Sequence, residues 1–199
     1  YLAMTDRVME HGRDLAGLKA HTVARMGIAR TLQTPRSFPS MSVLENVAAG
    51  ALFGGAQPSV AAALAVAREQ LEFMGLARFA DWPASSLTLA SRKRLELAKS
   101  MAMAPKVLML DEVNAGLNAS EIDGALRLIR QIAERGVTIL VIEHLMKVVL
   151  SLAERVLVLH HGQLIAEGSA AEIVRDKRVI EAYLGEKFAR RISAEAPGG

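Results

Sequence analysis

The sequence predicts an α/β fold, and two apolar runs with a helical segment between them are the basis of this prediction. The runs are KVLML, residues 106–110, and VTILVIE, residues 137–143. Both are apolar without alternation, which is typical of parallel strands that are covered on both faces. Because the links from strand to helix to strand are short, the three segments form a βαβ unit, the building block of a parallel sheet.

The helix between these strands has recognisable ends. Asn118 lies three residues ahead of Glu121, which is the spacing of a capping box, and Gly136 is the expected stop. Residues at helical spacing form one apolar face, namely Ile122, Leu126, Ile129 and Ala133.

The other elements follow from the same periodicity and turn rules. Helices are expected at 19–29, 42–53, 59–77, 91–104 and 146–153, two strands within 155–168, and two helical segments within 171–185. A turn at His161-Gly162 is expected to join the two strands. The tail RRISAEAPGG is expected to be disordered.

Composition excludes several classes of protein. The 199 residues carry a net charge of +3, which is too weakly basic to indicate nucleic-acid binding. Cysteine is absent from the sequence, which excludes disulfides and thiolate metal sites. No apolar run approaches the ~20 residues that a membrane-spanning helix needs. The first residue is Tyr1 rather than Met, which suggests a fragment.

Side chains with useful chemistry follow both predicted strands. Asp111 and Glu112 come after the first, and His144 comes after the second. Ligands of open α/β sheets bind at the carboxyl ends of strands, where Asp can hold Mg²⁺, Glu can activate water and His can bind a phosphate oxygen. Each signal alone is more often structural, as a helix N-terminus or an ordinary histidine. Their joint order favours a site.

These residues resemble one family, the ATP-binding-cassette (ABC) transporter ATPases of the branched-chain amino acid importer type. VLMLDE, residues 107–112, looks like the Walker B strand, and AGLN, residues 115–118, is similar to the D-loop. His144 matches the switch histidine of the H-loop. ARTLQTPRSFPSMSVLENV, residues 29–47, resembles the Q-loop region, with Gln33 as its glutamine.

The resemblance covers nearly all of residues 10–186 and implies a fold. That fold is an α/β P-loop NTPase (RecA-like) ABC ATPase core with an inserted helical subdomain, N-terminally truncated. The implied parts are a remnant of the N-terminal lobe with the Q-loop at 1–35, the helical subdomain at 36–100, the RecA-like lobe at 101–186 and a tail at 187–199.

The resemblance also implies roles for single residues. Glu112, His144 and Gln33 would be catalytic, with Glu112 acting on the attacking water and His144 sensing the γ-phosphate. Asp111 and Gln33 would hold Mg²⁺. The nucleotide would be contacted by the D-loop residues Ala115, Gly116, Leu117 and Asn118, and by the signature residues Thr88, Ala90 and Ser91.

The signature segment departs from the family pattern. The family has LSGGQ or LSxGQ, where this chain has LTLAS, residues 87–91. Thr88 keeps a hydroxyl for the γ-phosphate, but the Cβ of Ala90 restricts the close backbone approach that glycine allows. The basic run at 92–94 opposes the helix dipole, so it is either a solvated face or a partner of a nearby anion.

A larger departure concerns the phosphate-binding loop. No GxxxxGK[ST] sequence occurs in the chain. In the family that loop precedes the Q-loop, so it would fall ahead of Tyr1. Since the backbone cradle and its lysine hold the phosphates, we expect this chain alone to bind ATP weakly or not at all.

The leading interpretation is an ATPase, the ATP-hydrolysing subunit of a branched-chain amino acid importer that uses ATP and Mg²⁺. The implied partners are integral membrane permease subunits, a second ABC ATPase subunit in a homo- or heterodimer and, indirectly, a periplasmic amino-acid-binding protein, with no nucleic acid. The protein would lie at the cytoplasmic side of the inner membrane, as a peripheral protein. Phe38 and Met41 are the better candidates for a groove that receives the permease, whereas Val43 and Leu44 fit ordinary core.

Two alternatives stay open. One is a lipopolysaccharide-export-type or soluble ABC ATPase, since lipopolysaccharide-type ATPases end in a similar YLGE stretch. The other is a non-catalytic truncated fragment that only binds partners. A transport assay separates the first alternative from the importer, and the codons ahead of Tyr1 test the second.

Overall fold

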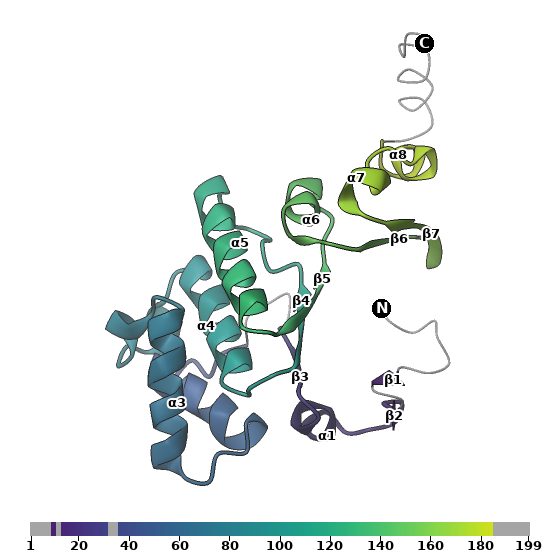
Figure 1. The fold of residues 1–199 in the computed structure, drawn as a ribbon. Helices are drawn as coiled ribbons and strands as arrows, with labels where there is room; N and C mark the ends of the chain where they lie inside the picture. Colours follow the sequence, from purple (N-terminus) through teal and green to yellow (C-terminus); the bar gives the residue numbers. More distant parts are fainter. Residues whose placement is uncertain (1–8, 11–12, 32–35, 185–199) are drawn as a thin grey trace. The chain divides into compact units, whose positions relative to one another are not determined.

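The computed structural model describes residues 9–10, 13–31 and 36–184. Figure 1 shows the order of the elements along the chain. Contacts divide the chain into two compact units, residues 7–143 and residues 144–199 together with 1–6. Gln33 and the C-terminal tail lie outside the described residues.

The larger unit contains a three-stranded parallel sheet. The central strand is β4 (Val107–Asp111), with β3 (Ile28–Arg30) on one side and β5 (Thr138–Ile142) on the other. Helix α5 (Ala119–Glu134) connects β4 to β5. The βαβ unit and the α/β class predicted from the sequence are therefore confirmed.

Helix α5 begins at the predicted capping box. The Asn118 side chain accepts the Glu121 N–H at 3.0 Å, and the Glu121 carboxylate accepts the Asn118 N–H at 2.9 Å. Gly136 follows the helix with φ +84°, a left-handed conformation that glycine adopts without strain. Ala133, expected on the apolar face, is exposed. The buried face consists of Leu126, Leu128, Ile129 and Ile132.

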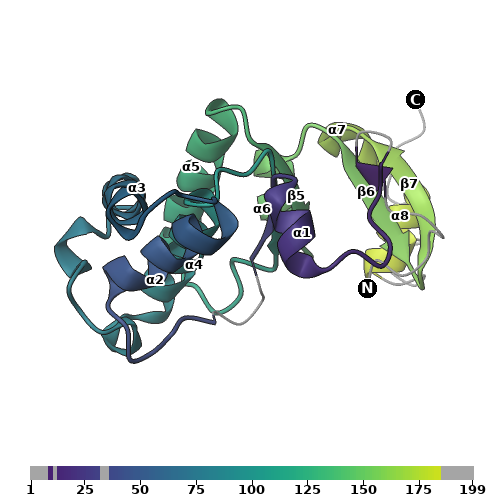
Figure 2. The ribbon, with the colours of Figure 1, turned by 90° about the horizontal axis from the view of Figure 1, so that it is seen from below.

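The segments ahead of β4 form a helical cluster. Its members are α2 (Val43–Ala49), α3 (Val60–Phe73) and α4 (Leu89–Met101), which Figure 2 shows together at one end of this unit. A π-helical turn, Gly50–Gly54, extends α2, so the segment predicted as one helix has two parts. The turn packs against α4 so closely that a Cβ at Gly50 would lie 2.7 Å from the Lys99 carbonyl oxygen.

Smaller elements complete this unit. They are the antiparallel pair β1 (Met9–Glu10) and β2 (Arg13–Asp14), helix α1 (Ala20–Arg25), and the 3₁₀ turns Ala77–Phe79 and Ala84–Ser86.

The sheet is covered on one face by α4 and α5, which lie along the same side of it in Figure 1. On the covered face, Leu108 and Leu110 of β4 are only 0% and 1% exposed. On the other face, Leu140 and Ile142 of β5 are 41% and 43% exposed. The expectation that both faces are covered is therefore wrong for β5 in this structure, although its apolar sequence predicts such cover.

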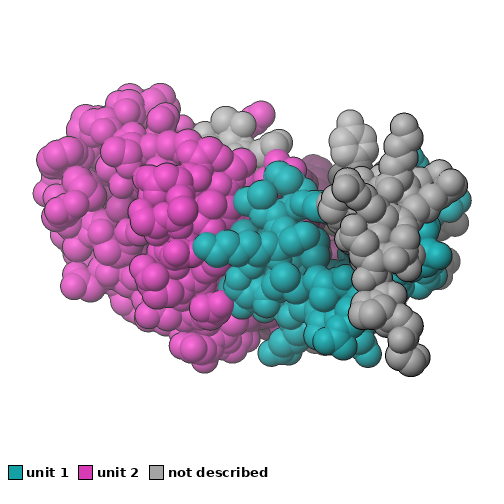
Figure 3. Space-filling view, turned by 90° about the horizontal axis from the view of Figure 1, so that it is seen from above, with its two compact units in different colours: residues 1–6, 144–199 teal, residues 7–143 magenta. Residues whose placement is uncertain are grey.

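The smaller unit, teal in Figure 3, has a core of its own. Its elements are α6 (Met146–Leu152), the antiparallel strands β6 (Val156–His160) and β7 (Gln163–Gly168), α7 (Ala170–Ile173) and α8 (Lys177–Leu184). Both turn residues have positive φ, +47° at His161 and +79° at Gly162, as a tight hairpin turn requires. The predicted hairpin is confirmed. The core of the smaller unit is formed by Ala166, Ile173 and Val179.

The helices that the structure describes are too short or too polar for any of them to span a bilayer. The division at residues 35, 100 and 186 stays a prediction.

Candidate functional site

Two adjacent carboxylates end the central strand. Asp111 is the last residue of β4 and pairs with Ile142, the last residue of β5. Glu112 follows, and its N–H donates to the Ile142 carbonyl oxygen at 3.0 Å. Its φ of +46° turns the chain sharply out of the sheet. Both carboxyl side chains are half-buried, so they remain accessible from solvent at the carboxyl edge of the sheet.

Asp111 is held by a cation from the neighbouring strand. The Arg30 guanidinium donates to the Asp111 carboxylate at 2.9 Å. The two side chains are 54% and 26% exposed, so water screens this pair. The sequence gives no signal for Arg30, because residues 19–29 are expected to form a helix, whereas in the structure Ile28–Arg30 forms the strand beside β4.

The D-loop candidates form one turn between the carboxylates and α5. The Ala115 N–H donates to the Glu112 carbonyl oxygen at 3.1 Å, and the Leu117 N–H donates to that of Asn114 at 3.2 Å. Gly116 has φ +77°, which suits a glycine. The structure therefore brings residues 115–118 and the carboxylate pair together.

A buried amide links this turn to the end of β5. Asn114 is 1% exposed, and its Nδ2 donates to the Glu143 carboxylate at 2.9 Å. This contact could not be predicted from the sequence, because Asn114 and Glu143 are 29 residues apart and only the fold brings them together. The contact fixes the end of β5 against the segment that follows Glu112.

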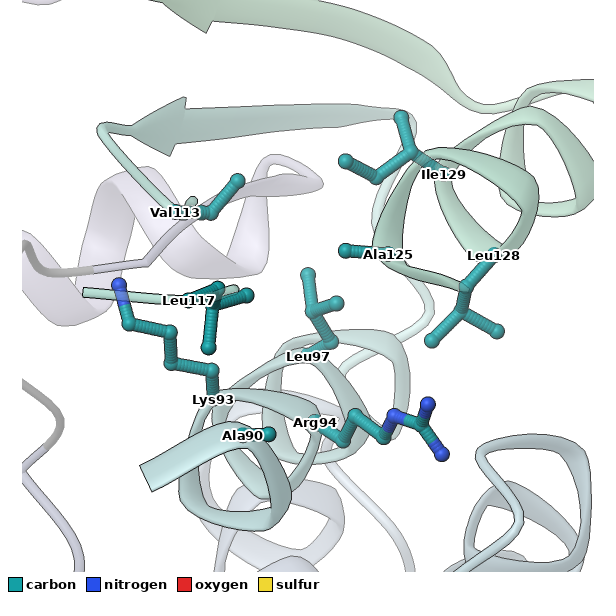
Figure 4. A pocket seen from close by; sticks show the side chains of 9 residues that line it. All are labelled: Ala90, Lys93, Arg94, Leu97, Val113, Leu117, Ala125, Leu128 and Ile129. Carbon is teal, nitrogen blue, oxygen red and sulfur yellow. The ribbon is translucent and has the colours of Figure 1, made fainter. Parts of the chain in front are cut away.

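The signature candidates lie at the start of α4. Thr88 is the N-cap, and its hydroxyl accepts the Ser91 N–H at 3.3 Å and donates to the Ser91 hydroxyl at 3.2 Å. Ala90 lines a small apolar recess between α4, the D-loop and α5, shown in Figure 4. The recess is lined by Ala90, Lys93, Arg94, Leu97, Val113, Leu117, Ala125, Leu128 and Ile129. Such a lining suits helix packing rather than a polar ligand.

The basic run after the signature separates into different environments. Arg92 is exposed, as a solvated face would be. Lys93 is half-buried, and its Nζ donates to the Glu112 carbonyl oxygen at 3.4 Å. Burial lowers the pKa of Lys93, whereas the Glu143 and Glu112 carboxylates act to raise it. Figure 4 shows the Lys93 side chain extending toward the segment with Val113 and Leu117.

The remaining two catalytic candidates are His144 and Gln33. His144 belongs to the other unit; its side chain is exposed and its carbonyl oxygen accepts the Tyr183 hydroxyl at 3.0 Å. Gln33 lies outside the described residues. The proximity of His144 and Gln33 to the carboxylates therefore stays a prediction.

The candidate docking residues differ in burial. Val43 and Leu44 are 0% and 6% exposed, so they belong to the core. Phe38 is 52% exposed, and the Asn46 side chain accepts its N–H at 2.7 Å and donates to its carbonyl oxygen at 3.0 Å. The Asn46 side chain thus fixes the backbone of Phe38, while the aromatic side chain is exposed.

The acidic residues suit a metal ion that arrives with a phosphate ligand. Across the residues that the structure describes, no three His, Asp or Glu side chains converge as a metal cluster would require. Mg²⁺ in nucleotide sites needs only one or two carboxylates, because phosphate oxygens and water complete its shell. Asp111 at the strand end therefore fits Mg²⁺ held jointly with a nucleotide.

Comparison with protein families agrees with this geometry. A family model described as ABC transporter matches residues 3–115. The chain belongs to the ABC transporter family. A second model, the branched-chain amino acid ATP-binding cassette transporter, matches residues 163–189 of this ABC protein. The predicted ATP-binding-subunit class is thereby confirmed.

Similar proteins support the same family. The ABC chain is 37% identical to the high-affinity branched-chain amino acid transport ATP-binding protein BraF of Pseudomonas aeruginosa, covering 88% of this chain and 74% of BraF. It is 39% identical to the corresponding protein LivG of Salmonella typhimurium, covering 87% and 74%. A nucleotide-free ATP-binding cassette from an ABC transporter superposes with a TM-score of 0.78 at 28% identity, covering 90% and 77%.

Proposed function

We propose that this ABC subunit hydrolyses ATP to drive the import of branched-chain amino acids. The observation that carries the chemical part is the Asp111–Glu112 pair at the carboxyl end of a parallel strand. The names of the relatives BraF and LivG support the transported class.

In this proposal Glu112 is the general base. Its carboxylate takes a proton from water as the water oxygen bonds to the γ-phosphorus and the bond to the ADP oxygen breaks. Asp111 and Gln33 would hold Mg²⁺, which would neutralise phosphate charge. His144 donates a hydrogen bond to the γ-phosphate as negative charge grows there.

The proposed assembly supplies the rest of the site. Two subunits close head to tail, so that Thr88, Ala90 and Ser91 of one face the nucleotide held by the other. The D-loop residues 115–118 lie at the same interface. Permease subunits dock beside Phe38 and Met41, and a periplasmic binding protein acts through them. The subunit is peripheral, at the cytoplasmic side of the inner membrane.

The test of the chemistry compares ATP hydrolysis by the wild type and by Glu112→Gln. It uses the full-length gene product with its permease partners, because residues 1–199 contain no GxxxxGK[ST] sequence. Loss of a general base lowers kcat by roughly 10²-fold or more, while ATP binding stays within a few-fold. Glu134→Gln, an exposed position on α5, is the matched control. Equal rates in Glu112→Gln and wild type would remove Glu112 from its role.

The transported class is tested separately in vesicles that contain the complete transporter. Leucine, isoleucine and valine should be taken up only with ATP and the binding protein present. Active hydrolysis without such uptake would contradict the importer assignment, and it would favour an export-type or soluble ATPase instead.

A further inference from the structure

The backbone at Glu112 is strained and needs support. Glu112 is not glycine, yet its φ is +46°. A conformation of this kind costs of the order of 1–3 kcal/mol and persists only where the surrounding contacts determine it. Two backbone hydrogen bonds contribute, one from the Glu112 N–H to the Ile142 carbonyl oxygen at 3.0 Å and one from the Ala115 N–H to the Glu112 carbonyl oxygen at 3.1 Å.

A third contact comes from a different element. The Lys93 Nζ, on α4, donates to the Glu112 carbonyl oxygen at 3.4 Å. The ladder bond and the turn bond are local, whereas Lys93 ties the turn to the helix that carries the signature residues. At 3.4 Å this hydrogen bond is long, and the positive charge of the donor adds attraction for the carbonyl oxygen.

Lys93 also stands out from the basic residues beside it. Arg92 is exposed, and the Arg94 guanidinium lies near Gly124, 3.3 Å from where a Cβ would be built. The positive charge of Lys93 interacts with two carboxylates, those of Glu143 and Glu112. Its half-buried charge is therefore placed between the ends of β5 and β4.

Glu143 is itself fixed at this place. Its carboxylate accepts the Asn114 amide at 2.9 Å, and Asn114 is buried. Lys93 thus faces an acidic group whose position is set by the turn after Glu112. In sequence, Glu143 directly precedes the candidate switch residue His144.

We propose that Lys93 is a positioning residue, whose ammonium group anchors the Glu112 turn to the signature helix and so orients the Glu112 carboxylate. The catalytic part of this inference rests on the proposed function. The structural part, the anchoring of the turn, does not.

The structural part is tested by amide hydrogen exchange on residues 1–199. Lys93→Met keeps most of the side-chain volume and removes the charge and the donor, so the Ala115 amide should exchange about three- to ten-fold faster. Lys93→Arg keeps a cation and should restore most of the protection. Arg92→Met removes the same charge from the same helix turn and should leave the Ala115 amide unchanged. Equal exchange in Lys93→Met and Arg92→Met, or no rescue by arginine, would overturn the anchoring.

The catalytic part is tested on the full-length gene product with its permease partners. Lys93→Met should lower kcat for ATP roughly three- to ten-fold, with KM changed less than about two-fold, because a misplaced base acts on the transition state rather than on binding. A faster-exchanging turn with unchanged kcat would overturn the orienting role. If Glu112→Gln keeps the wild-type rate, the proposed base role of Glu112 and the orienting role of Lys93 both fall, and the exchange result alone decides whether Lys93 anchors the turn.

Discussion

At the scale of single residues, the two carboxylates of the site are held by different means. Asp111 meets a side chain, the exposed guanidinium of Arg30. Glu112 is fixed through its backbone, by bonds to Ile142, Ala115 and Lys93. The proposed metal-binding carboxylate of Asp111 therefore pairs with a solvent-screened cation, while the proposed base Glu112 lies in a turn held by hydrogen bonds to its backbone.

The Arg30–Asp111 pair is predicted to add little stability. Exposed ion pairs contribute about 0–1 kcal/mol, because water and salt screen them. Arg30→Gln should therefore lower the free energy of unfolding by less than about 1 kcal/mol in urea titrations, and high salt should shrink the difference. Arg92→Gln, which removes an exposed arginine elsewhere, is the control. A loss above about 2 kcal/mol that persists in high salt would mean that the pair is not screened.

At the scale of the element, capping decides where several helices begin. Helix α2 starts at Ser42, whose hydroxyl accepts the Glu45 N–H at 3.1 Å while the Glu45 carboxylate accepts the Ser42 N–H at 2.7 Å. These hydrogen bonds to Ser42 hold the pKa of Glu45 below its ordinary value. Helix α3 starts at Ser59, which caps through Ala62 without an acidic residue in the first turn.

This difference predicts that the stability contributed by the Ser42 cap depends on pH, whereas the stability contributed by the Ser59 cap does not. Folding lowers the pKa of Glu45 below its ordinary value of 4.5. The ionised carboxylate therefore stabilises the fold above pH 4.5, and this stabilisation is lost as the pH falls through the lowered pKa. Ser42→Ala should cost about 1 kcal/mol at neutral pH, and less in acid, where protonated Glu45 no longer completes the box. Ser59→Ala should cost a similar amount at both pH values. Urea titrations of both variants measure this, and parallel pH profiles would contradict it.

The elements that the sequence predicted well are those with local causes. The capping box of Asn118 and Glu121 and the turn at His161-Gly162 depend on neighbouring residues, so spacing alone predicts them. The π-helical turn after α2 depends on the close approach of Gly50 to Lys99, two residues far apart in the chain.

The distinction between local and long-range contacts also applies to the candidate site. Asp111 and Glu112 could be predicted because they follow a strand directly. Their partners Arg30 and Lys93 come from β3 and α4, and only the folded chain shows which cation meets which carboxylate. Ala90 in the signature could be named from sequence, but its place in an apolar recess could not.

At the scale of the whole molecule, the chain consists of two units with separate cores. Residues 7–143 bury leucines such as Leu95 and Leu108, both 0% exposed. The other unit, which includes His144, buries a smaller set of side chains that includes Ile173, at 3% exposed. Because each core is made within its own unit, local stability need not be uniform along the chain.

Cavity-forming substitutions test whether the cores of the two units unfold independently of each other. Ile173→Ala removes part of the small core and should cost about 2–5 kcal/mol of local stability. Amide exchange should then accelerate in β7 and α8 and stay unchanged in β4 and α5, because their contacts lie in the other unit. Leu95→Ala in α4 is the matched substitution and should produce the reverse pattern. If either substitution accelerates exchange evenly across both units, the two cores unfold as one cooperative structure, and His144 and the Asp111–Glu112 pair belong to a single folding unit.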